Sequence, residues 1–152
     1  MMLRKPFKRT LMRNAGETDY EQIKSLLQSV DLPIEDVPQN INNYLMLFKG
    51  SQLIGTVGLE IYGEKALLRS LAVATAQQGN GYGQKLCHSI IERARELNIM
   101  ELYLLTENAE VFFASQGFKI ISRDMVDRKV KSSVEFQSVC PESATCMFLR
   151  VQ

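Results

Sequence analysis

The chain has 152 residues, the length of one ordinary globular domain, so a second full domain is not expected. Hydrophobic residues make up 45% and charged residues 23%, which argues against intrinsic disorder, a collagen-like chain or a long coiled coil. The formal net charge of +1 gives no basis for electrostatic capture of nucleic acid or of an anionic membrane. We therefore predict a single domain over residues 1–152, with a basic leader over residues 1–9 that we expect to be flexible.

The cysteines and the N-terminus indicate a cellular setting. The chain has three cysteines, Cys87, Cys140 and Cys146. Because their number is odd and the chain is large enough to be stabilised by its own core, we predict no disulfide framework. The basic N-terminus lacks the apolar run of a signal peptide, and no stretch approaches the roughly 18 apolar residues of a membrane span. We expect a reducing, cytoplasmic setting without membrane insertion.

The first third of the chain predicts a strand, a helix and a loop. A short strand is expected over 10–14, and Thr18 can cap a helix whose apolar residues recur at helical spacing. That helix should end near Asp31, because two prolines follow in the segment 32–43. We expect that segment to be a loop with a short helix near Ile34 to Val37.

An antiparallel meander follows. Strands are predicted over 44–49 and 52–62, and Gly50-Ser51 between them is typical of a hairpin turn. A turn at Gly63-Glu64 leads to another apolar strand over 66–74.

The second half of the chain alternates between helices and strands. Tyr82, Leu86 and Ile90 begin an apolar stripe with a period of three or four residues, which predicts a long amphipathic helix over 81–97. The elements expected after it are a strand over 100–105, a helix over 108–116, a strand over 118–122 and a last strand over 145–151.

A glycine-rich loop, QQGNGYGQK over 77–85, lies between the strand and the long helix. A helix N-terminus exposes unpaired backbone N–H groups and carries a partial positive charge, and glycines allow an anion to approach that backbone. The position therefore predicts a phosphate site. The spacing G-x-G-x-G does not fit the dinucleotide-binding pattern, and Gln84-Lys85-Leu86 does not fit the end of a P-loop.

The pattern Gln78-x-x-Gly81-x-Gly83, together with LRSLAVA before it and FFASQGF after it, resembles the GNAT superfamily of N-acetyltransferases. The resemblance implies an α/β fold with a mixed, mostly antiparallel sheet flanked by helices and split between its fourth and fifth strands. It also implies that acetyl-CoA binds to the loop and to backbone N–H groups at the end of the fourth strand. The implied residues are Leu71, Ala72, Val73, Gln78, Gly79, Asn80, Gly81, Tyr82, Gly83, Gln84 and Lys85. The alternative is an ordinary glycine-rich turn between a strand and a helix.

Direct acetyl transfer needs a neutral amine, hydrogen-bond donors that stabilise the oxyanion of the tetrahedral intermediate, and a proton donor for the departing CoA thiolate. Glu60 is the candidate general base, and its alternative reading is a solvated acidic residue near a strand end. Many family members carry tyrosine where this chain has Phe113, which cannot donate a proton. No general acid is assigned, although Ser115, Tyr103 or solvent are alternatives, and a thiol pKa of about 8.5 makes the thiolate a tolerable leaving group.

Three further blocks, GLEIYGEKALLRSLAV, LYLLTENAEVFF and VEFQSVCPESATCM, resemble the short, second-type arsenic-resistance N-acetyltransferases. This resemblance implies a small, amino-acid-like amine acceptor. Arginine is the usual partner of a carboxylate, so Arg69 and Arg123 are candidate acceptor-binding residues. Ser70 beside Arg69 belongs to the predicted acceptor site, and so do Glu135, Ser138 and Cys140, which lie in the last of the three blocks. The alternative for Arg69 is an outward-facing sheet residue paired with an acidic neighbour, and the alternative for Arg123 is a surface role.

The preferred hypothesis is an acetyl-CoA-dependent N-acetyltransferase that acts through a ternary complex, as a monomer or a homodimer. We expect no metal, because the cysteines and the single histidine, His88, do not form a ligand pattern. The competing hypothesis is a protein of the same fold that binds acetyl-CoA as a sensor or interaction module without turnover, which Phe113 favours.

Overall fold

The structure is a computed structural model that describes residues 9–152, apart from the side chains of residues 138 and 139. The strands are β1 (Thr10–Asn14), β2 (Tyr44–Lys49), β3 (Gln52–Tyr62), β4 (Lys65–Val73), β5 (Glu101–Thr106), β6 (Lys119–Ile120) and β7 (Thr145–Arg150). The α-helices are α1 (Tyr20–Ser29), α2 (Val37–Asn40), α3 (Tyr82–Glu96), α4 (Glu110–Ser115) and α5 (Arg128–Lys131). Short 3-10 turns are η1 (Glu17–Asp19), η2 (Ile41–Asn43), η3 (Thr75–Gln77) and η4 (Arg123–Met125), and η5 (Glu135–Val139) is a π-helix.

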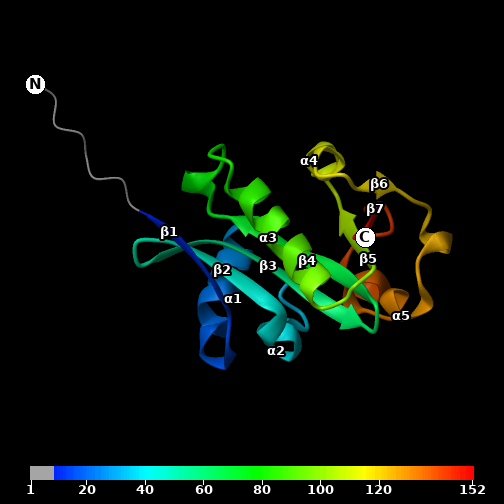
Figure 1. Cartoon of the computed structure of the whole chain (residues 1–152), viewed down its shortest axis with the longest axis horizontal. Helices are drawn as coiled ribbons and strands as arrows, with labels where there is room; N and C mark the ends of the chain where they lie inside the picture. Colours follow the sequence, from blue (N-terminus) through cyan, green and yellow to red (C-terminus); the bar gives the residue numbers. More distant parts are fainter. Residues whose placement is uncertain (1–8) are drawn as a thin grey trace, which may run out of the picture.

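The strands form one seven-stranded sheet in the order β1-β2-β3-β4-β5-β7-β6. The pair β4–β5 is parallel, and the other pairs are antiparallel. The predicted mixed sheet flanked by helices is therefore confirmed. In Figure 1, α1 and α2 lie near the β1–β3 end of the sheet and α5 lies near the β5–β7 end.

Helices cover the sheet through separate apolar clusters. The stripe predicted for α3 is buried at Leu86, Ile90 and Ala94, where it packs with α4 and the central strands. The helices α1 and α2 form a second cluster with β2, and the segment around α5 forms a third cluster with β4, β5 and β7. Burial of these apolar faces is the main driving force for folding.

The parallel pair β4–β5 is short. Its register joins Lys65 to Glu101 and Leu67 to Tyr103 and extends no further, although β4 continues to Val73. The two strands therefore separate beyond Leu67, as the predicted split between the fourth and fifth strands requires.

A β-bulge distorts β4 at the same place. Thr56 pairs with Ala72 and Gly58 pairs with Arg69, so one residue of β3 faces two residues of β4, including Ser70. The Ser70 backbone has φ +60°, a left-handed conformation that is uncommon for residues other than glycine. The bulge redirects the last residues of β4 at the point where β5 leaves it.

The C-terminal third differs in detail from the expected elements. The strand expected over 118–122 is reduced to β6, and the polar segment after it contains η4 and α5. The helix of the segment 32–43 begins at Val37, three residues later than the sequence suggests for its start. Among the described residues, no helix is long and apolar enough to cross a bilayer.

Candidate active site

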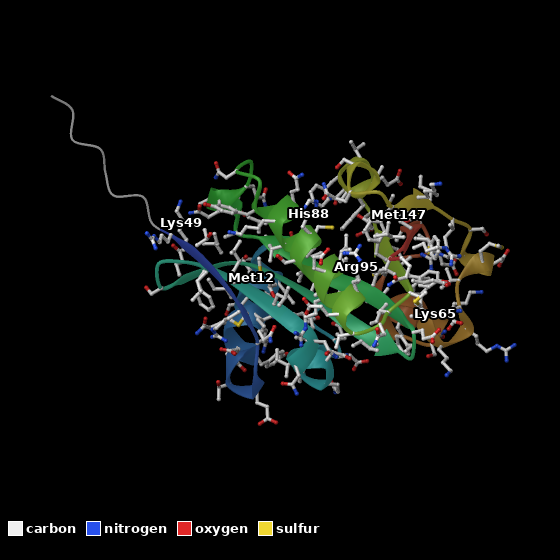
Figure 2. All side chains as sticks on the ribbon, viewed as in Figure 1. Met12, Lys49, Lys65, His88, Arg95 and Met147 are labelled. Atoms are coloured by element: carbon white, nitrogen blue, oxygen red, sulfur yellow. The ribbon has the colours of Figure 1, made fainter. Side chains whose placement is uncertain are left out.

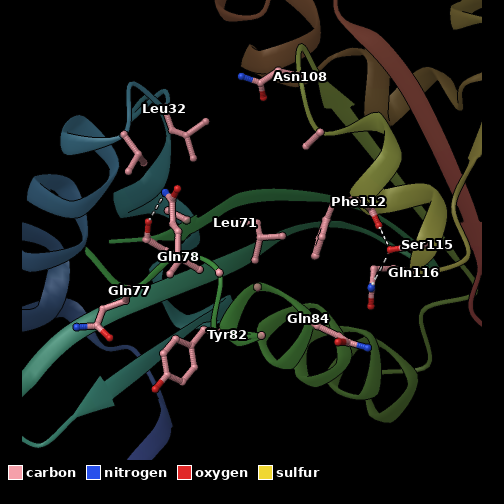
Figure 3. Close-up of a pocket in the computed structure, with 17 residues that line it drawn as sticks. Leu32, Leu71, Gln77, Gln78, Tyr82, Gln84, Asn108, Phe112, Ser115 and Gln116 are labelled. Atoms are coloured by element: carbon pink, nitrogen blue, oxygen red, sulfur yellow. Dashed lines mark hydrogen bonds between the residues drawn. The ribbon is translucent and has the colours of Figure 1, made fainter. Parts of the chain in front are cut away.

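A cavity of about 840 Å³ opens where β4, α3 and α4 come together. Figure 3 shows Leu71 of β4 at its centre, with Tyr82 and Gln84 of α3 on one side and Phe112 of α4 on another. The lining residues are Val30, Leu32, Leu71, Ala72, Val73, Gln77, Gln78, Gly79, Gly81, Tyr82, Gly83, Gln84, Asn108, Ala109, Phe112, Ser115 and Gln116. Within the described part of the chain, none of the residues lining this cavity is an Asp, Glu, Lys, Arg or His.

The glycine loop forms one wall of the cavity. Gly79 and Gly81 have φ of +85° and +82°, and a Cβ built on either would meet nothing within 4 Å. The loop is held by Gln78, whose Nε2 donates to the carbonyl of Val73 over 3.0 Å, and by Asn80, whose Nδ2 donates to the carbonyl of Gln77 over 3.0 Å. Gly81 is the N-cap of α3, so the open backbone lies at the positive end of a 15-residue helix.

Nine of the eleven residues predicted to contact acetyl-CoA line this cavity. The other two, Asn80 and Lys85, do not. Asn80 closes the loop through its side chain, and Lys85 donates from Nζ to Oγ1 of Thr10 over 2.7 Å. The rest of the lining includes Asn108, Phe112 and Gln116. Asn108 and Gln116 lie within the blocks LYLLTENAEVFF and FFASQGF, but the sequence did not single out either one as a binding residue.

A buried ionic cluster lies on β4, two residues before Leu71. The Arg69 side chain is fully buried, and its Nη1 donates to Oε1 of Glu60 over 2.6 Å. Its Nε lies 3.1 Å from Oε2 of Glu135 and donates to Oγ of Ser70 over 3.2 Å. Its Nη2 is buried and has no hydrogen-bond partner among the described residues. Glu60, Arg69, Ser70 and Glu135, all predicted site residues, are thus brought together.

Two tyrosines extend the cluster. The hydroxyl of Tyr62 donates to Oε2 of Glu60 over 2.6 Å, and the hydroxyl of Tyr44 lies 2.7 Å from Oγ of Ser70. Burial is the largest effect that raises the pKa of each tyrosine, so both remain protonated at neutral pH. The sequence contained one signal for Tyr44: a Cβ at Gly58 would collide with its ring, and a glycine inside a strand often marks a close approach.

Burial also raises the pKa of the Glu135 carboxyl, and the charge of Arg69 opposes this effect. Burial raises the pKa of the neighbouring Cys140 thiol to about 12. Sγ of Cys140 lies 3.7 Å from Oε1 of Glu135. A thiol that stays protonated is a weak hydrogen-bond donor, so Cys140 has the properties of a partner of Glu135 and not those of a nucleophile.

The remaining acceptor-site predictions fall elsewhere. Arg123 donates from Nη2 to the carbonyls of Pro141 and Ala144, over 2.9 and 3.2 Å, and its guanidinium lies 5.7 Å from the ring centre of Phe136. Arg123 therefore fastens the segment that leads into β7 and does not line the cavity. Ser138 belongs to η5, but its side chain is outside the described residues.

Phe113, at the usual tyrosine position, is buried in the core, where its ring makes an edge contact with that of Phe118. Its neighbour Phe112 faces the cavity instead. Of the alternative proton donors, Ser115 lines the cavity and donates to the carbonyl of Phe112 over 2.5 Å. Tyr103 is buried and donates to Glu101 over 3.2 Å, outside the cavity lining.

No group of three or more His, Cys, Asp or Glu residues is arranged to hold a metal ion in the described part of the chain. His88 lies on α3 (Figure 2). With Met12 of β1, it lines a separate hollow of the surface. The three cysteines are free thiols.

Comparisons with known proteins agree with this geometry. The model of the acetyltransferase (GNAT) family matches residues 11–118. An amino-acid acetyltransferase of Neisseria meningitidis is 32% identical over 92 residues, which are 59% of this chain and 21% of that protein. An uncharacterized N-acetyltransferase of Chlorobaculum tepidum is 25% identical over 145 residues, covering 90% of this chain and 91% of that one. The chain thus spans only about a fifth of the Neisseria relative.

A similar fold occurs in N-acetylglutamate synthase of Neisseria gonorrhoeae, whose crystal structure contains coenzyme A and N-acetyl-glutamate. The TM-score is 0.82 at 23% identity, and the match covers 98% of this chain and 36% of that one. The family match extends over most of the chain and includes β4, the glycine loop, α3 and α4, which are the elements that build the cavity. The chain belongs to the GNAT family of acetyltransferases.

Proposed function

We propose that this chain transfers the acetyl group of acetyl-CoA to the amino group of a small, amino-acid-like acceptor by direct attack within a ternary complex. One observation carries the proposal: a single cavity joins the glycine loop at the N-terminus of α3 to the edge of β4 that β5 leaves unpaired. An anion site and a set of free backbone groups are the two features that a CoA thioester requires of its site.

The residues of the loop fit the cofactor. The cavity wall carries no basic side chain within the described residues, so the pyrophosphate would be held by the backbone N–H groups over 79–83 and by the dipole of α3. Side chains at Gly79 and Gly81 would enter the space that the phosphates need. Bound acetyl-CoA would supply the acetyl group as a thioester, and its pantetheine arm would follow β4 along Leu71, Ala72 and Val73.

The reaction needs an amine with a free electron pair. That pair forms the new C–N bond at the thioester carbonyl, the C–S bond breaks, and the amine proton leaves for a base. Glu60 is our candidate base, and Tyr62, half-buried and hydrogen-bonded to it, connects it towards solvent. Backbone N–H groups of Leu71 to Val73 would stabilise the negative charge that develops on the carbonyl oxygen.

The CoA thiolate leaves without a dedicated tyrosine in this proposal. Phe113 has no donor, and Ser115 is the hydroxyl on α4 that faces the cavity. A thiol with an ordinary pKa of about 8.5 needs little assistance to leave, and Ser115 or water can return the proton afterwards.

The free Nη2 of Arg69 supports an acceptor that carries a carboxylate. The names of the Neisseria relatives, an amino-acid acetyltransferase and an N-acetylglutamate synthase, support an amino-acid acceptor as well. The resemblance to arsenic-resistance acetyltransferases adds an organoarsenical amino acid to the compounds worth testing. The free thiols support a reducing, cytoplasmic setting for the reaction.

The test is to measure CoA binding by calorimetry and to follow release of free thiol from acetyl-CoA with a panel of amino acids, simple amines and an organoarsenical amino acid. We expect binding and thiol release with an amino acid. One observation favours the sensor function instead, namely that no acidic or basic side chain among the described residues lines the cavity. CoA binding without thiol release for any panel member would support the sensor, and absence of CoA binding would contradict both functions.

A further inference from the structure

The charges around Arg69 do not balance. One guanidinium lies against two carboxylates, those of Glu60 and Glu135, and the side chains of all three residues are at most 6% exposed. A buried ion pair is tolerable when its charges cancel and its hydrogen bonds are complete. Here one carboxylate is in excess, and burial raises the pKa of Glu135. Burial therefore disfavours the charged form of Glu135.

The hydrogen bonds around Arg69 are also incomplete. Glu60 receives two short hydrogen bonds, from Arg69 and from Tyr62, each of 2.6 Å. Oε2 of Glu135 lies 3.1 Å from Nε of Arg69, and Oε1 of Glu135 lies 3.7 Å from the Cys140 thiol. Nη2 of Arg69 has no hydrogen-bond partner among the residues that the structure describes. A second carboxylate could bind Arg69 through two parallel N–H groups, a geometry that Glu135 does not achieve.

The turn that carries Glu135 is anchored on both sides and through Phe136, which packs against the apolar cluster of Leu67 and Tyr103. Val130 of α5 is fully buried before it, and Arg123 fastens the carbonyls of Pro141 and Ala144 after it. The connecting turn, η5, is a short π-helix. π-Helices are rare in proteins, and those that occur are often found at functional sites. Glu135 adds a polar contact between this turn and the sheet, its ion pair with Arg69.

We infer that Glu135 is an internal competitor for the acceptor: its carboxylate occupies Arg69 until an acceptor carboxylate takes its place. The inference rests on the proposed function and adds a cause of selectivity to it. An acceptor with a carboxylate can exchange with Glu135 at no loss of charge pairing, and an amine without one cannot. Glu135 touches Arg69 and not the reacting atoms, so it acts as a specificity residue.

The first test compares the steady-state kinetics of the wild type and Glu135→Gln. An amino acid that the wild type acetylates is paired with the amine obtained by its decarboxylation. We expect Glu135→Gln to lower KM for the amino acid about ten-fold, the effect of one charge-assisted hydrogen bond, with kcat little changed. KM for the amine should stay the same. Glu142→Gln, an exposed carboxylate of the same segment, is the matched control and should change neither KM.

An unchanged KM for the amino acid would overturn the inference, as would an equal fall in both KM values, because Glu135 would then only fill space. If no acceptor is acetylated at all, the proposed function fails and a second measurement still decides the inference. That measurement is amide hydrogen exchange of the peptide over 135–140 in the wild type, with acetate as the probe, acetamide as its uncharged match and chloride at equal ionic strength.

We expect acetate, and not acetamide or chloride, to speed exchange of this peptide by up to about ten-fold, because acetate releases Glu135 from Arg69. In Glu135→Gln the exchange should already be fast, and acetate should add nothing. Exchange in the wild type that does not respond to acetate would overturn the inference independently of any acetylation.

Discussion

At the scale of single residues, Arg69 joins segments that are far apart in the chain. Arg69 lies on β4, forms ion pairs with Glu60 of β3 and Glu135 of η5, and donates a hydrogen bond to the adjacent Ser70. Removing one member of a buried ion pair leaves an uncompensated charge, which typically costs about 3–5 kcal/mol. Variants of this cluster should therefore keep the shape of the side chain, and their stability must be measured beside their activity.

Glu60→Gln tests the candidate base. The amide keeps the size of the side chain and can still accept from Arg69, but it cannot take a proton, so we expect kcat to fall about 100-fold or more. CoA affinity should not change, because Glu60 does not line the cavity. Thiol release and calorimetry give the two quantities. Glu64→Gln, on the exposed turn after β3, is the control, and a kcat equal to the wild type in Glu60→Gln would remove Glu60 from the mechanism.

Phe113 and Phe112 allow a test of the missing proton donor. Because the Phe113 ring is buried against Phe118, Phe113→Tyr should bring no gain in kcat and should lower the free energy of unfolding by about 1–3 kcal/mol, the cost of an unpaired buried hydroxyl. Phe112→Tyr instead places a hydroxyl at the cavity and should be tolerated. Thiol-release rates and denaturant unfolding are the measurements. A faster Phe113→Tyr enzyme would show that this side chain reaches the thioester.

At the scale of elements, the site is built where β4 leaves β5. The glycine loop and the long helix after it were predictable, because glycines between an apolar strand and an amphipathic stripe have few other uses. The bulge at Ser70 was not, since serine gives no sign that its backbone has φ +60°. That conformation depends on pairing between β3 and β4, which is a tertiary effect. The positions of Asn108 and Gln116 in the cavity wall also depend on tertiary structure, so the sequence did not predict them.

Gly81→Glu tests the loop as an element. We expect CoA affinity to fall at least about 100-fold, because a carboxylate would enter the space of the pyrophosphate and oppose the helix dipole. Gly63→Glu is a matched control: Gly63 has φ +67°, its Cβ would also meet nothing within 4 Å, and it lies on the turn between β3 and β4, outside the cavity lining. Both variants place a glutamate in a left-handed backbone conformation, so the conformational strain is similar in the two. The difference in CoA affinity that calorimetry measures between them therefore reports on the position of the side chain. Equal affinities for CoA would place the cofactor elsewhere.

At the scale of the molecule, each of the three apolar clusters includes residues of the central strand β4. Arg69, the centre of the buried ionic cluster, lies on the same strand. Periodicity predicted most of this core, because the stripe of α3 and the apolar strands are local patterns. The sequence did not predict that Glu60, Arg69 and Glu135 are in contact. The chemistry of Glu60 and Arg69 made them candidates, and the resemblance of its block did so for Glu135, but only the path of η5 brings Glu135 to β4.

The first strand and the first helix depend on an ion pair that makes stability depend on pH. Asp19 accepts from Nη1 and Nη2 of Arg13 over 2.9 Å each and from the backbone of Gly16 over 2.8 Å. The hydrogen bonds from Arg13 are the largest effect that lowers the pKa of Asp19 from 3.8 to about 2. A carboxyl whose pKa is lower in the folded state stabilises the fold above its unfolded pKa, and this contribution is lost as the pH falls through the folded value.

We therefore expect Asp19→Asn to reduce the free energy of unfolding by on the order of 1–2 kcal/mol at pH 6, with the difference from the wild type shrinking between about pH 4 and pH 2. The Arg13 side chain is 43% exposed, so solvent keeps the effect below what the pKa shift alone would give, and added salt should reduce it further. Urea unfolding at a series of pH values measures this difference. Asp124→Asn, at an exposed aspartate outside the ion pairs of the described residues, should show no such trend. A pH-independent difference for Asp19→Asn would mean that its hydrogen bond to Gly16, and not its charge, anchors the start of α1 against β1.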